Sequence, residues 1–237
     1  MKNFKFVMLF CLFTSIALGQ KIIEKNMDYS NQFIDLDVKF ARTIEVKTWD
    51  QQKVYFKATI VTEDNQFIDQ YDIDFKETRN TITITEKAEA MFEAMRDYAD
   101  KNEKGKRRYW YNSGDRYKFF YVLYVPKNAN FKVESINGDL ESEQIVGNFE
   151  ADLINGDIEI SSYSGDLKLH TINGEIDLKV GNSSFTAETI HGDIYADENL
   201  KLTSSNRHVG QKVASLDMGK TNKLELNTIN GNMYLRL

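Results

Sequence analysis

Acidic side chains recur at a fixed step of 18 residues in the second half of the chain. Asp139, Asp157, Glu175 and Asp193 each directly follow a glycine. Strands stacked in register would set these carboxylates in a column about 5 Å apart, where they repel one another and favour a cation between them. Clustered carboxylates beside a basic residue or a metal are also the groups with which enzymes cleave polysaccharides.

The sequence around these acids argues against metal binding and catalysis. The repeat lacks the Gly-Gly-x-Gly-x-Asp pattern of calcium-binding rolls, so we expect solvated acids beside a bend. His170, His191 and His208 lie four, one and two residues before the nearest repeat glycine, so they should not meet in one metal site. Gly-x-Ser-x-Gly, Walker and dinucleotide motifs are absent from the sequence. We predict a protein that is not an enzyme and uses no metal or cofactor.

Glycines mark the elements that must position the acids. Eight of the 13 glycines lie on one nine-residue grid, and a ninth repeats the motif three residues off that grid. Segments of the type Ile-Asn-Gly-Asp double the period to 18 residues. Self-similarity at a fixed period is typical of repeat architectures. The structural repeat glycines are Gly138, Gly147, Gly156, Gly165, Gly174, Gly192, Gly210, Gly219 and Gly231.

Asn-Gly between apolar runs is also typical of a two-residue hairpin, so two folds compete for residues 131–237. In a hairpin, Ile154 and Asp157 would pair and share a face. The apolar positions instead keep one parity through the glycine, as in Ile154, Gly156 and Ile158, which indicates a chain that continues. We predict an all-β, parallel β-solenoid-like repeat of about 18 residues per coil, in two half-coils of nine, each coil stacked on the preceding one. An antiparallel meander is the alternative.

Residues 1–19 have the pattern of a secretory signal peptide. Lys2 and Lys5 precede an apolar stretch that ends in Ala17-Leu18-Gly19, a small-x-small cleavage pattern. This stretch is too short to span a bilayer comfortably, and no later segment is long and apolar enough to anchor the chain. We expect an exported protein, in the periplasm, at the cell surface or secreted, that is not transmembrane after cleavage.

Cleavage of this segment also fixes the redox chemistry and charge of the mature chain. It removes Cys11, the only cysteine, so the mature chain can form no disulfide. A lipoprotein would need Cys11 as its first mature residue, but the residues that follow it are still mostly apolar. Loss of Lys2 and Lys5 moves the formal charge from −6 to −8. An acidic exported protein is a poor nucleic-acid binder, so no nucleic-acid partner is expected.

Residues 20–130 form a strand-rich part without the repeat. Apolar residues at helical spacing predict one inserted helix over residues 87–100, with its apolar face packed on the sheet. A basic and aromatic loop follows over residues 101–116. The simpler interpretation is a solvated excursion between strands; alternatively, aromatic faces stack on sugars and cations attract an anionic polymer. The candidate binding residues are Arg107, Arg108, Tyr109, Trp110 and Tyr111.

Phe33 to Ile60, Tyr121 to Asn130 and the Ile-Asn-Gly-Asp-Ile repeats together resemble the bacterial putative-adhesin domain of unknown function. That domain is akin to the autotransporter-adhesin head domains of exported Bacteroidetes proteins. The resemblance covers residues 33–237 and implies an exported, non-enzymatic β-repeat domain on the cell envelope. The family has no catalytic residues to carry over. The helix and loop at residues 87–116 depart from its plain strand pattern.

The hypothesis from the sequence is therefore an adhesin-like or structural envelope protein whose partner is a cell-surface glycan or an envelope protein. Residues 20–130 and 131–237 are expected to form one continuous elongated domain. Two alternatives stay open: a carbohydrate-binding module that uses the loop at residues 101–116, and a polysaccharide-active enzyme on a β-solenoid.

Overall fold

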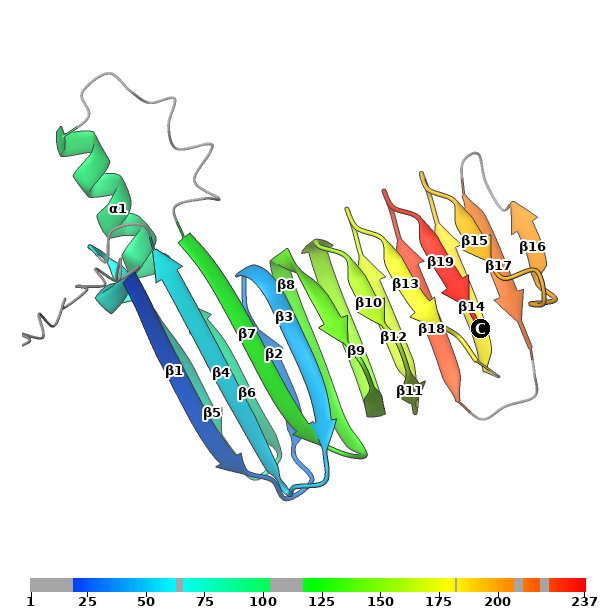
Figure 1. The fold of residues 1–237 in the computed structure, drawn as a ribbon, viewed down its shortest axis with the longest axis horizontal. Coiled ribbons are helices and arrows are strands. Elements are labelled where there is room, and N and C mark those ends of the chain that lie inside the picture. The colour runs from blue at the N-terminus through cyan, green and yellow to red at the C-terminus, as the bar shows by residue number, and fades with distance from the viewer. Residues whose placement is uncertain (1–18, 63–65, 103–116, 182, 207–210, 218–221) are drawn as a thin grey trace, which may run out of the picture.

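The computed structural model describes residues 19–62, 66–102, 117–181, 183–206, 211–217 and 222–237. In these residues the chain is mostly β, with one α-helix, which confirms an all-β class with an inserted helix (Figure 1). The N-terminal elements are β1 (Gly19–Asp28), β2 (Phe33–Asp37), β3 (Phe40–Trp49), β4 (Lys53–Thr62), the 3₁₀ turn η1 (Ile68–Gln70), β5 (Asp72–Glu77), β6 (Thr81–Lys87), α1 (Glu89–Asn102) and β7 (Tyr117–Pro126).

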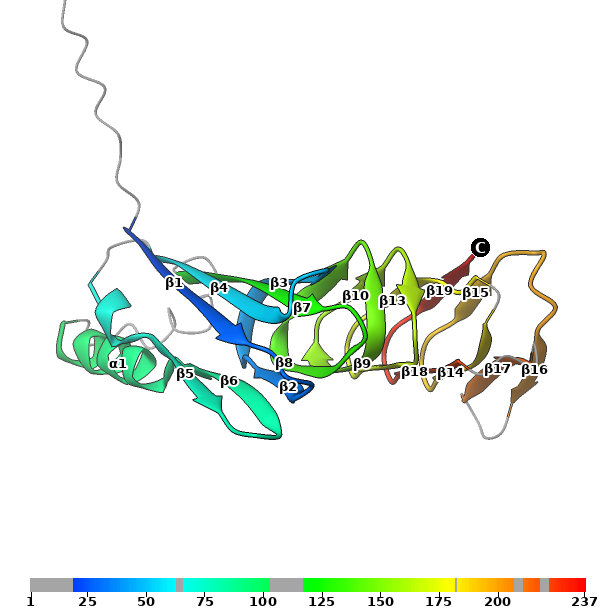
Figure 2. The same cartoon turned by 90° about the horizontal axis from the view of Figure 1, so that it is seen from below.

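These strands form two layers, an upper and a lower one in the view of Figure 2. The upper layer has the order β1-β4-β7-β3 and the lower layer the order β5-β6-β2. The long strand β8 (Ala129–Ser142) joins them. Its first part pairs with β2 in the lower layer and its last part with β3 in the upper layer. The two layers therefore continue into the repeat region without a break.

The repeat region consists of short strands that pair in parallel at the 18-residue step. Phe131 is in register with Phe149, and Phe149 with Leu167. Among the described strands of this region, only the contacts of β17 with β14 and with β16 are antiparallel. The strands are β9 (Ile145–Asn155), β10 (Ile158–Ile160), β11 (Tyr163–Ser164), β12 (Leu167–Thr171), β13 (Ile176–Lys179), β14 (Ser184–Thr189), β15 (Ile194–Ala196), β16 (Thr203–Asn206), β17 (Lys212–Leu216), β18 (Lys223–Thr228) and β19 (Met233–Arg236).

The spatial order of the repeats differs from their order in the sequence. We call one lower strand and the upper strand that follows it a tier. The tier β18–β19, at the end of the chain, lies between the tiers β12–β13 and β14–β15 and pairs with both in parallel (Figure 1). The expectation that each coil stacks on the preceding one is therefore wrong for the tiers β14–β15 and β18–β19.

The bend between the two layers also differs from the prediction. Leu153 is fully buried, Ile154 is 39% exposed, and Gly156 is buried again. Two successive residues, Ile154 and Asn155, therefore point outward at the corner, so Ile154 does not share the inward face of Ile158. The equivalent Ile136 and Ile190 are each 37% exposed.

The repeat glycines lie where neighbouring tiers approach most closely. A Cβ atom on Gly156 would overlap the carbonyl oxygen of Gly138, and one on Gly174 would overlap that of Gly156. The column continues in spatial order, because a Cβ on Gly231 would overlap the Gly174 carbonyl and one on Gly192 that of Gly231. Glycine is thus required by space rather than by a left-handed backbone at these corners.

The helix α1 covers the end of the N-terminal layers. It begins at Glu89 and ends at Asn102, two residues later than predicted. Met91 is fully buried, and the ring of Phe92 lies edge-on to Phe40 with centroids 4.8 Å apart. Its apolar face therefore packs on the sheet. Among the described residues, α1 is too short and too polar to cross a membrane, and no other α-helix is present.

Candidate functional site

The predicted binding residues Arg107, Arg108, Tyr109, Trp110 and Tyr111 lie outside the described residues, as do Gly210, Gly219 and His208. The described part of the chain carries other surface features of the same chemical kind. They lie on the outward sides of the two layers, because the inward sides are filled by one continuous apolar core.

An aromatic cluster made of Trp49, Tyr55 and Tyr124 lies on the outward side of the upper layer. The ring centroids of Trp49 and Tyr124 are 4.9 Å apart, and those of Tyr55 and Tyr124 are 5.7 Å apart. All three side chains are half-buried. They come from β3, β4 and β7, which are neighbours in the layer but distant in the sequence.

Local alternation explains why these rings face outward. Tyr55 lies between Val54 and Phe56, which are both fully buried, so its side chain must point to the opposite face. Tyr124 is directly opposite Tyr55 in the antiparallel pair of β4 and β7. The Trp49 indole N–H donates a 2.7 Å hydrogen bond to the Lys53 carbonyl, which fixes the orientation of the ring.

Polar groups at the edge of the cluster set its electrostatics. The ammonium of Lys47 lies 5.6 Å from the centroid of the Tyr124 ring, and hydrogen bonding to Glu45 at 2.6 Å raises the Lys47 pKa. Burial raises the pKa of Tyr55, with a further contribution from Glu24. The cluster is thus an aromatic surface whose edge carries paired charges, Lys47 with Glu45 and Lys57 with Glu24.

A pocket beside α1 combines aromatic and basic residues. Its volume is 310 Å³, at the small end of the range for ligand sites. Tyr117 follows directly on the loop predicted at residues 101–116. The lining residues are Phe40, Ala41, Arg42, Tyr117, Lys118, Phe119 and Asn137.

Carboxylates occupy the middle of the upper layer. Glu45, Glu141, Glu159 and Asp177 lie in one row across successive strands. A pocket of 170 Å³ in this region is lined by Glu45, Glu141, Ser142, Glu143, Glu159 and Ser161, with no basic side chain among these residues. Polysaccharide cleavage of the kind considered above needs carboxylates with a basic residue or a metal beside them. The lining of this pocket supplies the carboxylates but no basic side chain.

The predicted column of acids lies at the corners and makes hydrogen bonds to the backbone. Oδ1 of Asp139 accepts the Asp157 N–H at 3.1 Å, and Oδ1 of Asp157 accepts the Glu175 N–H at 2.7 Å. In the next tier the position of the acid is taken by Asn232, whose Oδ1 accepts the Asp193 N–H at 3.0 Å. Asp139, Asp157 and Asn232 thus each join one tier to the next.

The outward side of the lower layer carries paired charges. Glu150 forms ion pairs with Lys168 at 3.2 Å and with Lys132 at 3.7 Å. Nδ1 of His170 lies 3.0 Å from Oδ1 of Asp152, whereas His191 is exposed at a corner, so these two histidines do not meet. Within the residues that the structure describes, no three His, Cys, Asp or Glu side chains are grouped to hold a metal ion.

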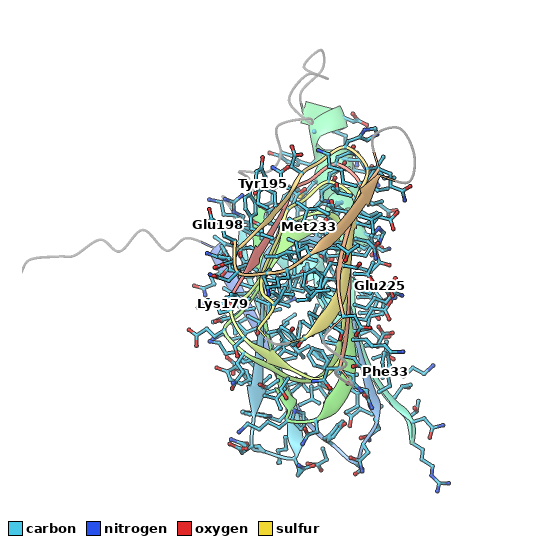
Figure 3. The ribbon with its side chains drawn as sticks, turned by 90° about the vertical axis from the view of Figure 1, so that its right-hand side faces the viewer. Phe33, Lys179, Tyr195, Glu198, Glu225 and Met233 are labelled. Atoms are coloured by element: carbon cyan, nitrogen blue, oxygen red, sulfur yellow. The ribbon has the colours of Figure 1, made fainter. Side chains whose placement is uncertain are left out.

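A second aromatic pair lies at the far end of the upper layer. The rings of Tyr195 and Tyr234 stack with centroids 5.3 Å apart and an interplanar angle of 11°. Figure 3, a view along the stack of tiers, shows Tyr195 and Lys179 on one side, Glu225 and Phe33 on the other, and Met233 between the layers. Tyr195 is 52% exposed, so aromatic groups face outward at both ends of the upper layer.

Comparison with known proteins gives a likeness of fold. No family model and no curated protein matches the chain. The crystal structure of a "putative cell adhesion protein" from Clostridium sporogenes is similar with a TM-score of 0.52 and 11% identity, over 92% of this chain and 99% of that one. A "putative adhesin" from Bacteroides fragilis gives a TM-score of 0.34 at 11% identity, over 91% of this chain and 97% of that one. The chain thus shares its fold with the Clostridium sporogenes protein.

The aromatic cluster was not predicted from the sequence, although one signal for it was present. Tyr55 and Tyr124 lie at outward-facing positions of β4 and β7. The inward-facing positions of these two strands are mostly apolar. Large aromatic residues at such outward-facing positions indicate a contact surface. Trp49, at the end of β3, could not be assigned to the cluster without knowing that β7 lies between β3 and β4.

Proposed function

We propose that this chain is an exported, non-enzymatic, adhesin-like protein of the cell envelope, in which a parallel β-solenoid holds contact surfaces outward. Parallel pairing at the 18-residue step and the continuous glycine column support the solenoid. The likeness of fold to a cell adhesion protein supports the functional class. The apolar stretch from Phe6 to Leu18, preceded by Lys2 and Lys5, supports export.

The observation that carries the proposal is the outward position of Trp49, Tyr55 and Tyr124. Aromatic rings are normally placed in the core, where their burial contributes most to stability. Here three of them gather on the solvent side of a rigid layer whose core is already filled. Such a surface costs little conformational entropy when it binds, because its rings are already held by one another.

The ligand class that this cluster favours is a carbohydrate. The C–H faces of sugar rings pack on aromatic faces, and hydroxyl groups at the rim can reach Lys47 and Glu45. This second, narrower hypothesis uses described residues in place of the loop at residues 101–116. It deepens the first one and requires no catalytic group.

Binding by residues 20–237 to intact cells and to a glycan array tests the proposal. The variant Trp49→Ala/Tyr124→Ala should lose most binding and remain folded. The matched control is Phe33→Ala, because Phe33 is 40% exposed but lies on the lower layer; it should bind like the parent. Retained binding by the double variant would overturn the role of the cluster. Binding to cells without any binding to glycans would point to a protein partner on the envelope.

Export is tested separately from binding. Cell fractionation followed by sequencing of the N-terminus should find the protein outside the cytoplasm with Gln20 as its first residue. An uncleaved chain in the cytoplasmic fraction would contradict the envelope assignment, whatever the binding assay shows.

A further inference from the structure

The tier β18–β19 fills a slot whose two walls are formed by earlier parts of the chain. On one side, β18 pairs with β12 over five residues; on the other, it pairs with β14 over six. The strand β19 pairs in the same way with β13 and with β15. Figure 1 shows these two strands, in orange and red, between the yellow strands of the neighbouring tiers. The C-terminal segment, residues 223–237, is therefore held by backbone hydrogen bonds on both edges.

The side chains of this segment make the same kinds of contact that join other neighbouring tiers. The Thr228 hydroxyl donates to the Gly174 carbonyl at 3.0 Å, as Thr171 does to Gly156 at 2.9 Å. Nδ2 of Asn230 donates to Oδ1 of Asn173 at 2.7 Å. The slot thus recognises an extended segment with alternating leucines, then threonine and, three residues later, a glycine.

The walls of the slot carry the register needed to close on each other. Lys168 of β12 and Thr186 of β14 are both in register with Glu225 of β18. They are 18 residues apart in the sequence, which is the step that joins β9 directly to β12. Leu178 and Phe185 are seven residues apart, as are the equivalent Ile160 and Leu167, so the connection is long enough for direct stacking. The spacing and the register are therefore compatible with direct pairing of β12 and β14 in the absence of β18.

We propose that the C-terminal segment is an exchangeable strand, and that the slot between β12–β13 and β14–β15 also takes this segment from a second copy of the chain. The segment from a second copy would make the same contacts in the slot, which is the condition for domain swapping. When the segment of the same chain leaves the slot, either the equivalent segment of a second copy takes its place or the two walls of the slot pair directly with each other. This interaction is independent of the aromatic cluster.

Cysteine placement tests exchange in a chain of residues 20–237, because these residues contain no cysteine. Full mature chains carrying Lys168→Cys and Glu225→Cys separately are mixed, incubated at high concentration below the unfolding temperature, and then oxidised. Exchange should produce a disulfide-linked dimer whose yield rises with time and concentration. The matched control mixture is Glu150→Cys with Glu225→Cys, two tiers apart at about 9.6 Å, which is too far for a disulfide. Equal dimer yields in the two mixtures would overturn the proposal.

Two variants within one chain complete the test. Lys168→Cys/Glu225→Cys should form an intrachain disulfide; its absence would contradict the tier order on which the proposal rests. Lys168→Cys/Thr186→Cys should form one only when the segment has left the slot. Adding Gly231→Val, whose side chain would overlap the Gly174 carbonyl, should therefore increase that disulfide several-fold, with the β-type circular dichroism retained. No increase would exclude closure of the walls.

Discussion

The carboxylate of Glu86 accepts a 2.9 Å hydrogen bond from the backbone N–H of Phe40 in a buried site that also holds the hydroxyl of Tyr121. Glu86 is 3% exposed, and its second oxygen, Oε1, has no hydrogen-bond partner among the described residues. Burial is the largest influence on this group and raises its pKa to about 7, against the lowering effect of the bond from Phe40. The folded protein therefore holds a proton that the unfolded chain releases.

We predict that the chain loses stability as the pH rises from 4.5 to about 7. Between pH 4.5, the usual pKa of the group, and about 7, the folded state binds more protons than the unfolded state. The free energy of unfolding should therefore fall by about 3 kcal/mol across this interval and change little from this group outside it. Urea denaturation at a series of pH values measures the slope.

Glu86→Gln should remove most of that slope, because glutamine keeps the carbonyl acceptor for Phe40 and cannot ionise. Glu89→Gln is the matched control. Glu89 is exposed and paired with Lys39 at 2.8 Å, which lowers its pKa, so its loss should leave the slope in place. The assignment to Glu86 would be wrong if both variants kept the pH dependence of the parent.

Gly174 tests the close approach of the tiers. Its missing Cβ faces the Gly156 carbonyl, which belongs to the backbone and cannot move aside. Gly174→Ala should therefore destabilise the protein by about 2 kcal/mol or more. Gly181 serves as the control, because it has a positive φ of 50° but open space around it. Gly181→Asn should cost less than about 0.5 kcal/mol, since asparagine tolerates that backbone. Equal losses in thermal denaturation would contradict the steric explanation.

The glycine column shows which part of the fold was predictable from the sequence. Neighbouring tiers approach closely at each of these corners, so glycine recurs in the sequence at the same interval. The 18-residue step and the corner glycines could therefore both be predicted. The helix was predictable because Met91 and Met95 share one helical face. The strand β1 was missed because Lys21 and Lys25 point inward at the sheet edge, where Lys21 Nζ reaches the Tyr71 carbonyl at 2.7 Å, and so interrupt the apolar alternation.

The order of the tiers and the aromatic cluster were not predictable in this way. The Thr-Ile-Asn-Gly motif that ends at Gly231 is the same as the one that ends at Gly174, so this motif alone does not say which tiers will be its neighbours. The three-residue offset of Gly231 from the grid was the one visible sign. Trp49, Tyr55 and Tyr124 meet only through the order of β4, β7 and β3, which is set by long-range pairing.

Side-chain hydrogen bonds between tiers form an asparagine ladder made of Asn137, Asn155, Asn173 and Asn230. Each asparagine should contribute to stability in proportion to the number of these bonds that it makes. Asn173 donates to Asn155 at 2.8 Å and accepts from Asn230 at 2.7 Å, whereas Asn137, at the start of the ladder, only accepts from Asn155. Asn173→Ala should cost about 1–2 kcal/mol and Asn137→Ala about half as much. Chemical denaturation of the two variants measures the difference, and the reverse order would show that the ladder is not the cause.

Variants of Asp157 distinguish a structural role for the column of acids from a metal-binding role. Its Oδ1 accepts the Glu175 N–H, and its own N–H donates to Asp139, so the side chain already has a backbone partner. Asp157→Asn keeps an acceptor oxygen and should change stability by less than about 0.5 kcal/mol, whereas Asp157→Ala removes it and should cost about 1–2 kcal/mol. Millimolar calcium should raise the unfolding temperature by no more than a few degrees in the parent and in both variants. A large rise in the parent that a chelator reverses and Asp157→Asn abolishes would show instead that the column holds a cation.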